Sequence, residues 1–349
     1  MESMNNCDPD FNGGFPVLLI MRDFDPTSPT FEEDIVTVPI FGPNFVGQGI
    51  SLLEGYSGFY HTPITQIRES HAYQAGSTPS DYPRVEERIL DCDIGVQGRN
   101  WAEFVQVETL LWKIMKPPKG KRPDFVLRFY FGPGEDDWRE ITVRLERTPK
   151  DLFSRGPGLT TKYKWSLTLL ACDPYWYSRT LQDTVTFDSG TGSGANRISQ
   201  RTLVVDNHAD QECWLEYASN QLTATSTFTL PDALGVYPRV TEAQDQAYFQ
   251  KFGVHSPEYL RQGQRIYLTL PPLGVGKSFL VQTNPLQIAL ETADDSQEIA
   301  NLQGDFNNAL PPHTVGAELP ITLRGGTAQT QLSVYAVQQW DRYMGGEAL

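Results

Sequence analysis

The clearest pattern of hydrophobic and polar positions lies between residues 100 and 178. Asn100 and Glu103 have the spacing of a capping box, in which each side chain bonds the backbone of the other residue. Large apolar residues then recur at helical spacing up to Pro117, namely Trp101, Phe104, Val107, Leu111, Ile114 and Met115. The pattern predicts one amphipathic helix of about four turns.

Alternation with a period of two follows this helix and predicts strands. Residues 125–131 and residues 141–146 each alternate, and the turn-forming cluster 132–137 separates them, which is typical of a hairpin. Residues 164–169 alternate again and run directly into residues 172–178. One helix among several strands is therefore expected in the first half of the chain.

The second half contains short β-type runs separated by turn residues, which favours a sandwich. These runs are 202–206, 213–217, 225–230, 265–270, 278–283, 286–291, 319–323 and 331–337. Residues 241–252 interrupt them with helix-compatible sequence, and the Gly/Ser-rich stretch 189–194 reads as a linker or a wide hairpin loop. We therefore predict a mainly β fold with two domains, residues 1–180 and residues 181–349.

The composition fits this picture and restricts the partners. The chain has 349 residues, of which 39% are hydrophobic, enough for two domain cores, and a formal charge of -15. Such a field repels phosphate, so neither stable nucleic-acid binding nor anionic-membrane binding is expected, although the basic loop 116–122 could make a local contact with DNA. Residues 1–100 are acidic, whereas residues 101–180 carry a net positive charge.

The sequence indicates a protein that folds in a cytoplasm. It has no run of 18 apolar residues, and its first ten residues are polar and acidic, unlike a secretory signal. Its cysteines are Cys7, Cys92, Cys172 and Cys213, which form no C-x-x-C pair. We expect reduced thiols, most of them buried.

The sequence contains no complete motif for catalysis, for cofactor binding or for metal binding. Residues 274–278 resemble a phosphate loop, but Pro271 replaces its first glycine and β-like sequence follows. The five histidines show no metal-ligand spacing, and adjacent acidic pairs do not establish the separation that glycoside hydrolysis needs. We therefore expect no catalytic residue, no cofactor and no metal site, and not an enzyme.

Four aromatic residues in the first hundred, Tyr56, Phe59, Tyr60 and Tyr73, have two interpretations. They could belong to the core, or they could serve an interface or a sugar platform. The sequence leaves both open.

Three segments of the first half resemble the distal tail family of bacteriophage minor tail proteins: 129–139, 165–171 and 173–178. The most specific element is Asp173, Pro174, Tyr175, Trp176 and Tyr177, directly after a predicted strand. Trp214 and the segments 227–232 and 307–312 add a weaker likeness. The resemblance covers most of residues 90–349, while residues 1–90 carry little that matches.

The resemblance implies two β-sandwich domains: a tail-tube-like belt domain with one helix at residues 1–180, and a galectin-like sandwich at residues 181–349. It also implies a virion protein, made and assembled in the host cytoplasm, of which six copies form a ring at the distal end of the tail. Such a ring joins the tail tube protein to the central hub or fibre and tape-measure proteins, and it holds peripheral receptor-binding proteins.

A ring needs one patch of each copy to contact a different patch of the next, and blocks of opposite charge suit that contact. We predict that the basic side chains Arg139, Arg144 and Arg147 of one copy face the acidic side chains Glu32, Glu33 and Asp34 of its neighbour. Two other functions stay open. The first is a carbohydrate-binding adhesin with a hollow lined by aromatic and polar groups, and the second is a cell-wall hydrolase.

Overall fold

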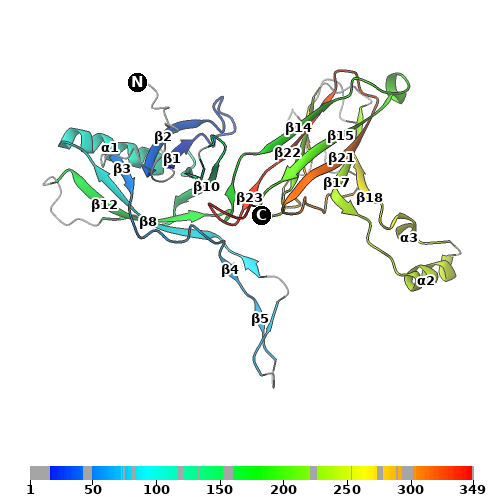
Figure 1. Ribbon diagram of the computed structural model, residues 1–349, viewed down its shortest axis with the longest axis horizontal. Coiled ribbons are helices and arrows are strands. Elements are labelled where there is room, and N and C mark those ends of the chain that lie inside the picture. Colours follow the sequence, from blue (N-terminus) through cyan, green and yellow to red (C-terminus); the bar gives the residue numbers. More distant parts are fainter. Residues whose placement is uncertain are drawn as a thin grey trace. The chain divides into compact units, whose positions relative to one another are not determined.

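The computed structural model describes residues 16–41, 49–71, 73, 75–80, 83–116, 119, 121–132, 134–151, 160–220, 226–252, 254–272, 278–287, 290–292, 302 and 304–347. The fold is mainly β, as predicted, with several sheets (Figure 1). The chain divides into two compact units, residues 1–179 with 340–346, and residues 180–339 with 347–349. The sequence-based division instead assigned residues 340–346 to the second domain, and the contacts described below explain why they group with the first.

The first unit is built on one large sheet with the strand order β2-β1-β9-β10-β12-β8-β3. These strands are β1 (Val17–Arg22), β2 (Asp34–Phe41), β3 (Gly49–Leu52), β8 (Arg88–Gln97), β9 (Phe125–Tyr130), β10 (Trp138–Leu145) and β12 (Lys162–Ala171). Short strands join beside them, namely β11 (Lys150–Asp151), β13 (Trp176–Tyr177) and β23 (Gln339–Trp340). The predicted hairpin is the antiparallel pair β9 and β10.

The two halves of this sheet enclose one core. Side chains from β1 and β9 and from β8 and β12 line the same internal cavity, whose volume of about 10 Å³ holds no more than a water molecule. The predicted helix is α1 (Trp101–Met115), which buries Phe104, Leu111, Ile114 and Met115. The Asn100 half of the predicted capping box forms, since the Asn100 side chain accepts from the Glu103 N–H, whereas the Glu103 carboxylate accepts from the N–H of Arg99, the residue before the cap.

The described residues between 62 and 87 form an arm that leaves the first unit's sheet and that sequence analysis did not predict (Figure 1). Its two short ladders pair β4 (Ile64–Thr65) with β7 (Arg84–Val85) and β5 (Arg68–Glu69) with β6 (Thr78–Pro79). Every described residue of these four strands is exposed.

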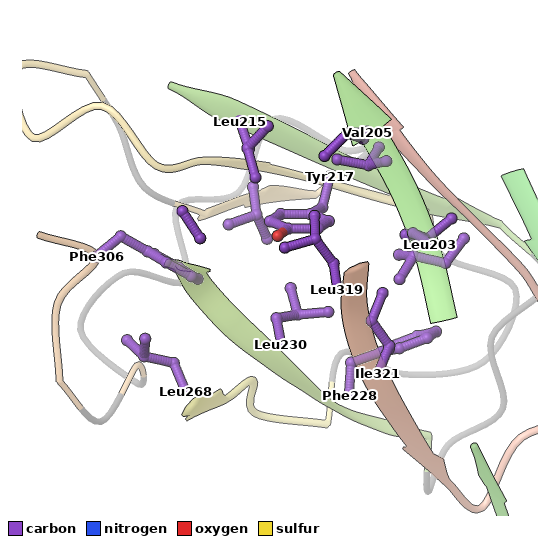
Figure 2. Close-up of a cluster of buried hydrophobic side chains, with 14 of the residues drawn as sticks. Leu203, Val205, Leu215, Tyr217, Phe228, Leu230, Leu268, Phe306, Leu319 and Ile321 are labelled. Carbon is purple, nitrogen blue, oxygen red and sulfur yellow. The ribbon is translucent and has the colours of Figure 1, made fainter. Parts of the chain in front are cut away.

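The second unit is a sandwich of two sheets, with the strand orders β14-β22-β16-β19-β20 and β15-β21-β17-β18. Its strands are β14 (Leu181–Thr186), β15 (Ile198–Asn207), β16 (Leu215–Asn220), β17 (Thr227–Val236), β18 (Arg265–Thr269), β19 (Phe279–Gln282), β20 (Leu290–Thr292), β21 (Thr314–Arg324) and β22 (Gln331–Ala336). Figure 2 shows the buried side chains that fill the space between the sheets, among them Tyr217, Phe228 and Leu319.

Helices lie outside this sandwich. The predicted one is α2 (Glu242–Phe252), and α3 (Pro257–Arg261) and the short η1 (Gly194–Asn196) were not predicted. The Gly/Ser-rich stretch 189–194 lies inside the second unit, as part of the loop between β14 and β15, which belong to different sheets. It is therefore not a linker between the units.

Candidate functional site

The motif of residues 173–177 folds into a turn that buries one large side chain. The Asp173 carboxylate accepts from the Tyr175 N–H at 3.2 Å and from the Tyr177 hydroxyl. Trp176 is fully buried, and its indole N–H donates to the Phe59 carbonyl at 3.2 Å. The turn thus anchors the end of the first unit's main segment in its core.

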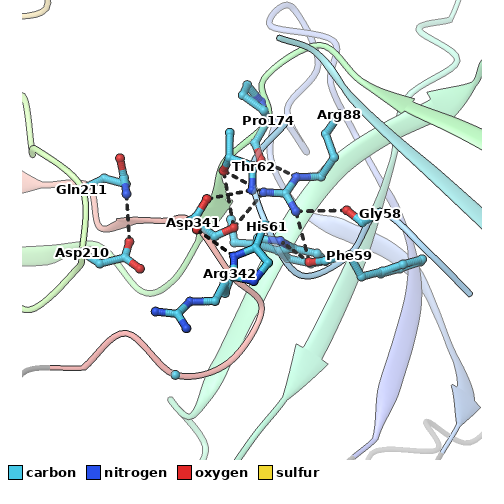
Figure 3. Close-up of polar contacts among 12 residues, drawn as sticks. Gly58, Phe59, His61, Thr62, Arg88, Pro174, Asp210, Gln211, Asp341 and Arg342 are labelled. Atoms are coloured by element: carbon cyan, nitrogen blue, oxygen red, sulfur yellow. Dashed lines mark hydrogen bonds and ion pairs between the residues drawn. The ribbon is translucent and has the colours of Figure 1, made fainter. Parts of the chain in front are cut away.

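Arg88 is the centre of this region (Figure 3). Its side chain is 0% exposed, although arginine is rarely buried without partners. It donates to the carbonyls of Pro174 at 2.7 Å, Gly58 at 3.1 Å, Phe59 at 3.1 Å and Asp341 at 2.7 Å, and to the Thr62 hydroxyl at 2.9 Å. These bonds match the five N–H groups of a guanidinium.

Arg88 and the nearby carboxylate of Asp341 each favour the charged form of the other. Burial lowers the pKa of Arg88 to about 10, so the group stays protonated at neutral pH, and the charge of Asp341 opposes the shift. Burial alone would raise the pKa of Asp341, but hydrogen bonds from Thr62 and the nearby charge of Arg88 bring that pKa below its ordinary value. The Asp341 carboxylate accepts from the Thr62 N–H at 2.7 Å and lies 3.4 Å from His61 Nδ1.

A second buried arginine holds the same chain segment. Arg139 is 0% exposed and donates to the carbonyls of Arg342 at 2.8 Å and Gly345 at 2.6 Å. Its guanidinium carbon lies 3.5 Å from the centre of the Trp340 ring, a cation–π contact. We call residues 340–346 the C-terminal latch, because Arg88 and Arg139 together hold them on the first unit.

The burial of Arg139 corrects one sequence-based prediction. Arg139 was expected to face a neighbouring copy, but its guanidinium is enclosed by its own chain and cannot reach one. Asp34 is also engaged within the chain, through Arg22 at 2.8 Å and Arg128 at 3.2 Å. Arg22 and Arg128 lie on adjacent strands, and both also pair with Glu140, so two arginines and two carboxylates balance one another within the chain.

The other proposed interface charges lie at the surface. Arg144 pairs with Asp124 at 2.8 Å, and Arg147 lies 3.8 Å from Asp91, but the side chains of both arginines are about half exposed. Glu32 and Glu33 are exposed. Their contacts with another copy stay a prediction.

The arm presents apolar side chains to solvent. Ile64 is 63% exposed, Ile67 52% and Val85 41%, and Tyr73 at the arm's far end is fully exposed. Of the other aromatic residues with two interpretations, Phe59 belongs to the core, while Tyr56 and Tyr60 are more than two-fifths exposed. Phe59 is therefore a core residue, while an interface or a sugar platform stays a prediction for Tyr56, Tyr60 and Tyr73.

The two segments of the second unit that carry the family likeness meet at one buried carboxylate. Asp232 accepts from the backbone N–H groups of Asn307 at 3.1 Å and Asn308 at 3.0 Å, and from the Asn308 side-chain amide. These bonds tie the loop before β21 to β17 and make the two segments one structural element.

Metal-binding clusters and reactive thiols were two kinds of site to look for among the described residues. No cluster of three His, Cys, Asp or Glu side chains able to hold a metal is found among the described residues. Burial raises the pKa of both Cys92 and Cys213 to about 12, so neither is a thiolate at neutral pH. Cys172 is exposed, and Cys7 lies outside the described residues.

Within the described ranges, no helix is long and apolar enough to span a bilayer.

Comparisons with known proteins give a limited result. No family model and no curated protein matches the sequence. Among solved structures, the chain is similar to the SPP1 Dit protein, described as a paradigm of the hub adsorption apparatus in phages that infect Gram-positive bacteria. The identity is 13%, over 82% of this chain and 93% of that chain, and the TM-score is 0.48.

The second solved structure is that of infectious bursal disease virus, strain Gx, with 10% identity over 93% of this chain and 67% of that chain, and a TM-score of 0.20. At TM-scores below 0.5, neither similarity establishes a shared fold.

Sequence reasoning identified the motif of residues 173–177 but missed Arg88, the latch and the arm. A signal for Arg88 was present. In β8 the buried positions alternate as Arg88, Leu90, Cys92 and Ile94, so the arginine occupies the inward phase of the strand.

Proposed function

We propose that this chain is a structural protein of a bacteriophage tail tip, and that its copies associate through the arm into a ring. The arm carries the first part of this proposal. Two-stranded ladders of two residues are marginal in water, and this arm also exposes three aliphatic side chains and a tyrosine. A protein surface of this kind is typical of a contact with another chain.

A second copy is the partner that fits best. One arm reaching from each copy to a different patch of the next is a heterologous contact, and such contacts close into rings when the rotation allows. The aliphatic side chains of the arm would then supply the buried centre of the contact, and exposed charges such as Arg144 and Glu33 its rim.

The tail-tip location is supported by the motif of residues 173–177 and its family likeness. The first unit is made of two segments, residues 1–179 and residues 340–346. Arg88 joins them, since it donates to the Pro174 carbonyl of the motif and to the Asp341 carbonyl. In this proposal six copies form the ring, with the first unit as the belt and the second as an outer, galectin-like sandwich. The ring joins the tail tube protein to the central hub or fibre and tape-measure proteins, and it offers docking sites to receptor-binding proteins. No catalytic step is involved.

Immunogold electron microscopy of purified virions tests this location directly, with antibodies raised against the full chain. We expect gold at the end of the tail that lies away from the head. Labelling on the head, or virions that lack the chain by mass spectrometry, would contradict the proposal.

A further inference from the structure

The outer face of the five-stranded sheet in the second unit is hollowed. The hollow has a volume of about 350 Å³, within the usual range for small-molecule sites, and lies over β16, β19, β20 and β22. Its lining includes Ser219, Asn220, Glu291, Gln331, Ser333 and Tyr335. The hollow is distinct from the arm, which belongs to the first unit.

The polar lining groups are hydroxyls, amides and one carboxylate, and the apolar lining comes from Ala218, Leu280 and the rings of Phe279 and Tyr335, of which Phe279 is buried. None of the described residues that line the hollow is Lys, Arg or His. Side-chain contacts keep several of these groups in place: Ser333 Oγ lies 2.8 Å from the Thr184 hydroxyl, and the Asn220 amide donates to Gln331 Oε1 at 3.5 Å. Such a set suits a ligand that both donates and accepts hydrogen bonds and carries no negative charge.

The second unit's other sheet offers a contrast. A hollow of about 410 Å³ over β15, β17, β18 and β21 is lined by Tyr267 and Arg201. The Arg201 guanidinium is occupied by Asp188, Ser189 and the Thr186 carbonyl. The hollow beside Tyr335 contains the carboxylate of Glu291, whereas the other hollow contains the guanidinium of Arg201. Hydroxyl groups donate strong hydrogen bonds to carboxylates.

We propose that the hollow beside Tyr335 binds a short segment of a neutral polysaccharide. Sugar hydroxyls pair with the amides, hydroxyls and Glu291, while the apolar face of a sugar ring packs on the aromatic ring of Tyr335. An acidic sugar or a phosphate would be repelled by Glu291 and by the chain's charge of -15. This binding goes beyond the structural role, since a ring would form whether or not the hollow is filled.

The test uses the full chain on an array that carries neutral and acidic oligosaccharides from bacterial walls and capsules. Four proteins are compared: wild type, Tyr335→Ala, Tyr335→Phe and Tyr267→Ala. We expect wild type to bind at least one neutral oligosaccharide and Tyr335→Ala to bind it about tenfold more weakly. Tyr335→Phe keeps the ring and most of the affinity, and Tyr267→Ala, the matched tyrosine of the other hollow, binds like wild type.

Ala218→Gln serves as an independent variant, because it places a longer side chain in the hollow from a half-buried position. The thermal unfolding midpoint of each variant checks that it is folded. If Tyr335→Ala unfolds at a lower temperature than wild type, Ala218→Gln still tests the hollow, and we expect it to weaken binding. The proposal is overturned if wild type binds no neutral oligosaccharide, if it binds acidic ones alone, or if folded Tyr335→Ala and Ala218→Gln bind like wild type.

Discussion

At the residue scale, Arg88 and Arg139 do what apolar residues do elsewhere in a core: they fill inward positions of strands. They differ in that each gathers backbone carbonyls from distant parts of the chain, Arg88 from positions up to 253 residues away and Arg139 up to 206. Carbonyl groups that are buried without a donor are costly, so Arg88 stabilises several loops at once and Arg139 stabilises the latch.

The first prediction concerns Arg88→Met, which keeps the apolar stem and removes the five hydrogen bonds. Several buried carbonyls would lose their donor, and we expect the free energy of unfolding of the first unit to fall by about 3 kcal/mol or more. Arg84→Met is the control, because Arg84 is mostly exposed and only its ion pair with Glu86 is lost, worth less than about 1 kcal/mol. Tryptophan fluorescence in urea measures both, since all of the seven tryptophans except Trp214 lie in the first unit. Equal losses in the two variants would contradict the role given to Arg88.

The second prediction concerns pH. The pKa of Asp341 is lowered in the folded chain, so its contribution to stability is present above its ordinary pKa of 3.8 and is lost as pH falls through the folded value. The first unit of wild type should therefore lose stability more steeply below about pH 4 than Asp341→Asn, which has no carboxylate to protonate. Urea unfolding at several pH values compares the two proteins. Parallel curves would show that the Asp341 carboxylate does not stabilise the latch.

The limits of sequence reasoning at this scale are physical. Arg139 was assigned to an interface because residues 101–180 carry a net positive charge, but the charge of a block does not show which of its arginines is buried. The alternation in β10 pointed the other way, because Arg139 shares the inward phase of Ile141 and Val143. The partners of Arg88 and Arg139 at the end of the chain could not have been found, since nothing local in residues 340–346 indicates where they bind.

At the element scale, strongly periodic segments were predictable and the arm was not. The helix α1 and the hairpin of β9 and β10 carry their period, cap and turn signals within a short stretch of sequence. The strands of the arm are only two residues long, and all of their described residues are exposed. No face of the arm has to be apolar, so its sequence lacks the alternation of apolar and polar residues that predicts a strand. A segment that binds another chain does not need the apolar periodicity of a segment that packs on the core of its own chain.

The third prediction tests the arm. Ile64→Asp with Ile67→Asp should weaken self-association roughly 100-fold or more, because two apolar side chains buried at the contact would be replaced by charges. Unfolding of the first unit should stay unchanged, since both residues are exposed in the single chain.

A matched control for the arm is Leu286→Asp with Val315→Asp, two exposed apolar residues of the second unit, 91% and 70% exposed. Sedimentation velocity at matched concentrations compares the two double variants with wild type. If both change the association alike, or if neither does, the arm is not the contact.

At the scale of the whole molecule, charge is distributed so that copies could attract one another. The first hundred residues are acidic and residues 101–180 carry a net positive charge, and both blocks belong to the first unit apart from Thr180. In a heterologous ring the two blocks would meet at every contact, so added salt should weaken association.

The fourth prediction follows from this charge pattern. Arg144→Glu with Arg147→Glu should shift the association of the full chain to higher concentration by about tenfold, because rim charges contribute modestly to affinity. Arg99→Glu provides a control, since Arg99 also lies at the surface of the first unit. An association that is unchanged in the double variant at low salt would remove the electrostatic part of the account.

The central claim is that this chain is built to associate with itself. Light scattering of the purified wild-type chain, at several concentrations and at two salt levels, tests it most directly. We expect a mass of about six times the 39.2 kDa of one chain at high concentration and low salt. A mass of one chain under every condition would contradict self-assembly through the arm.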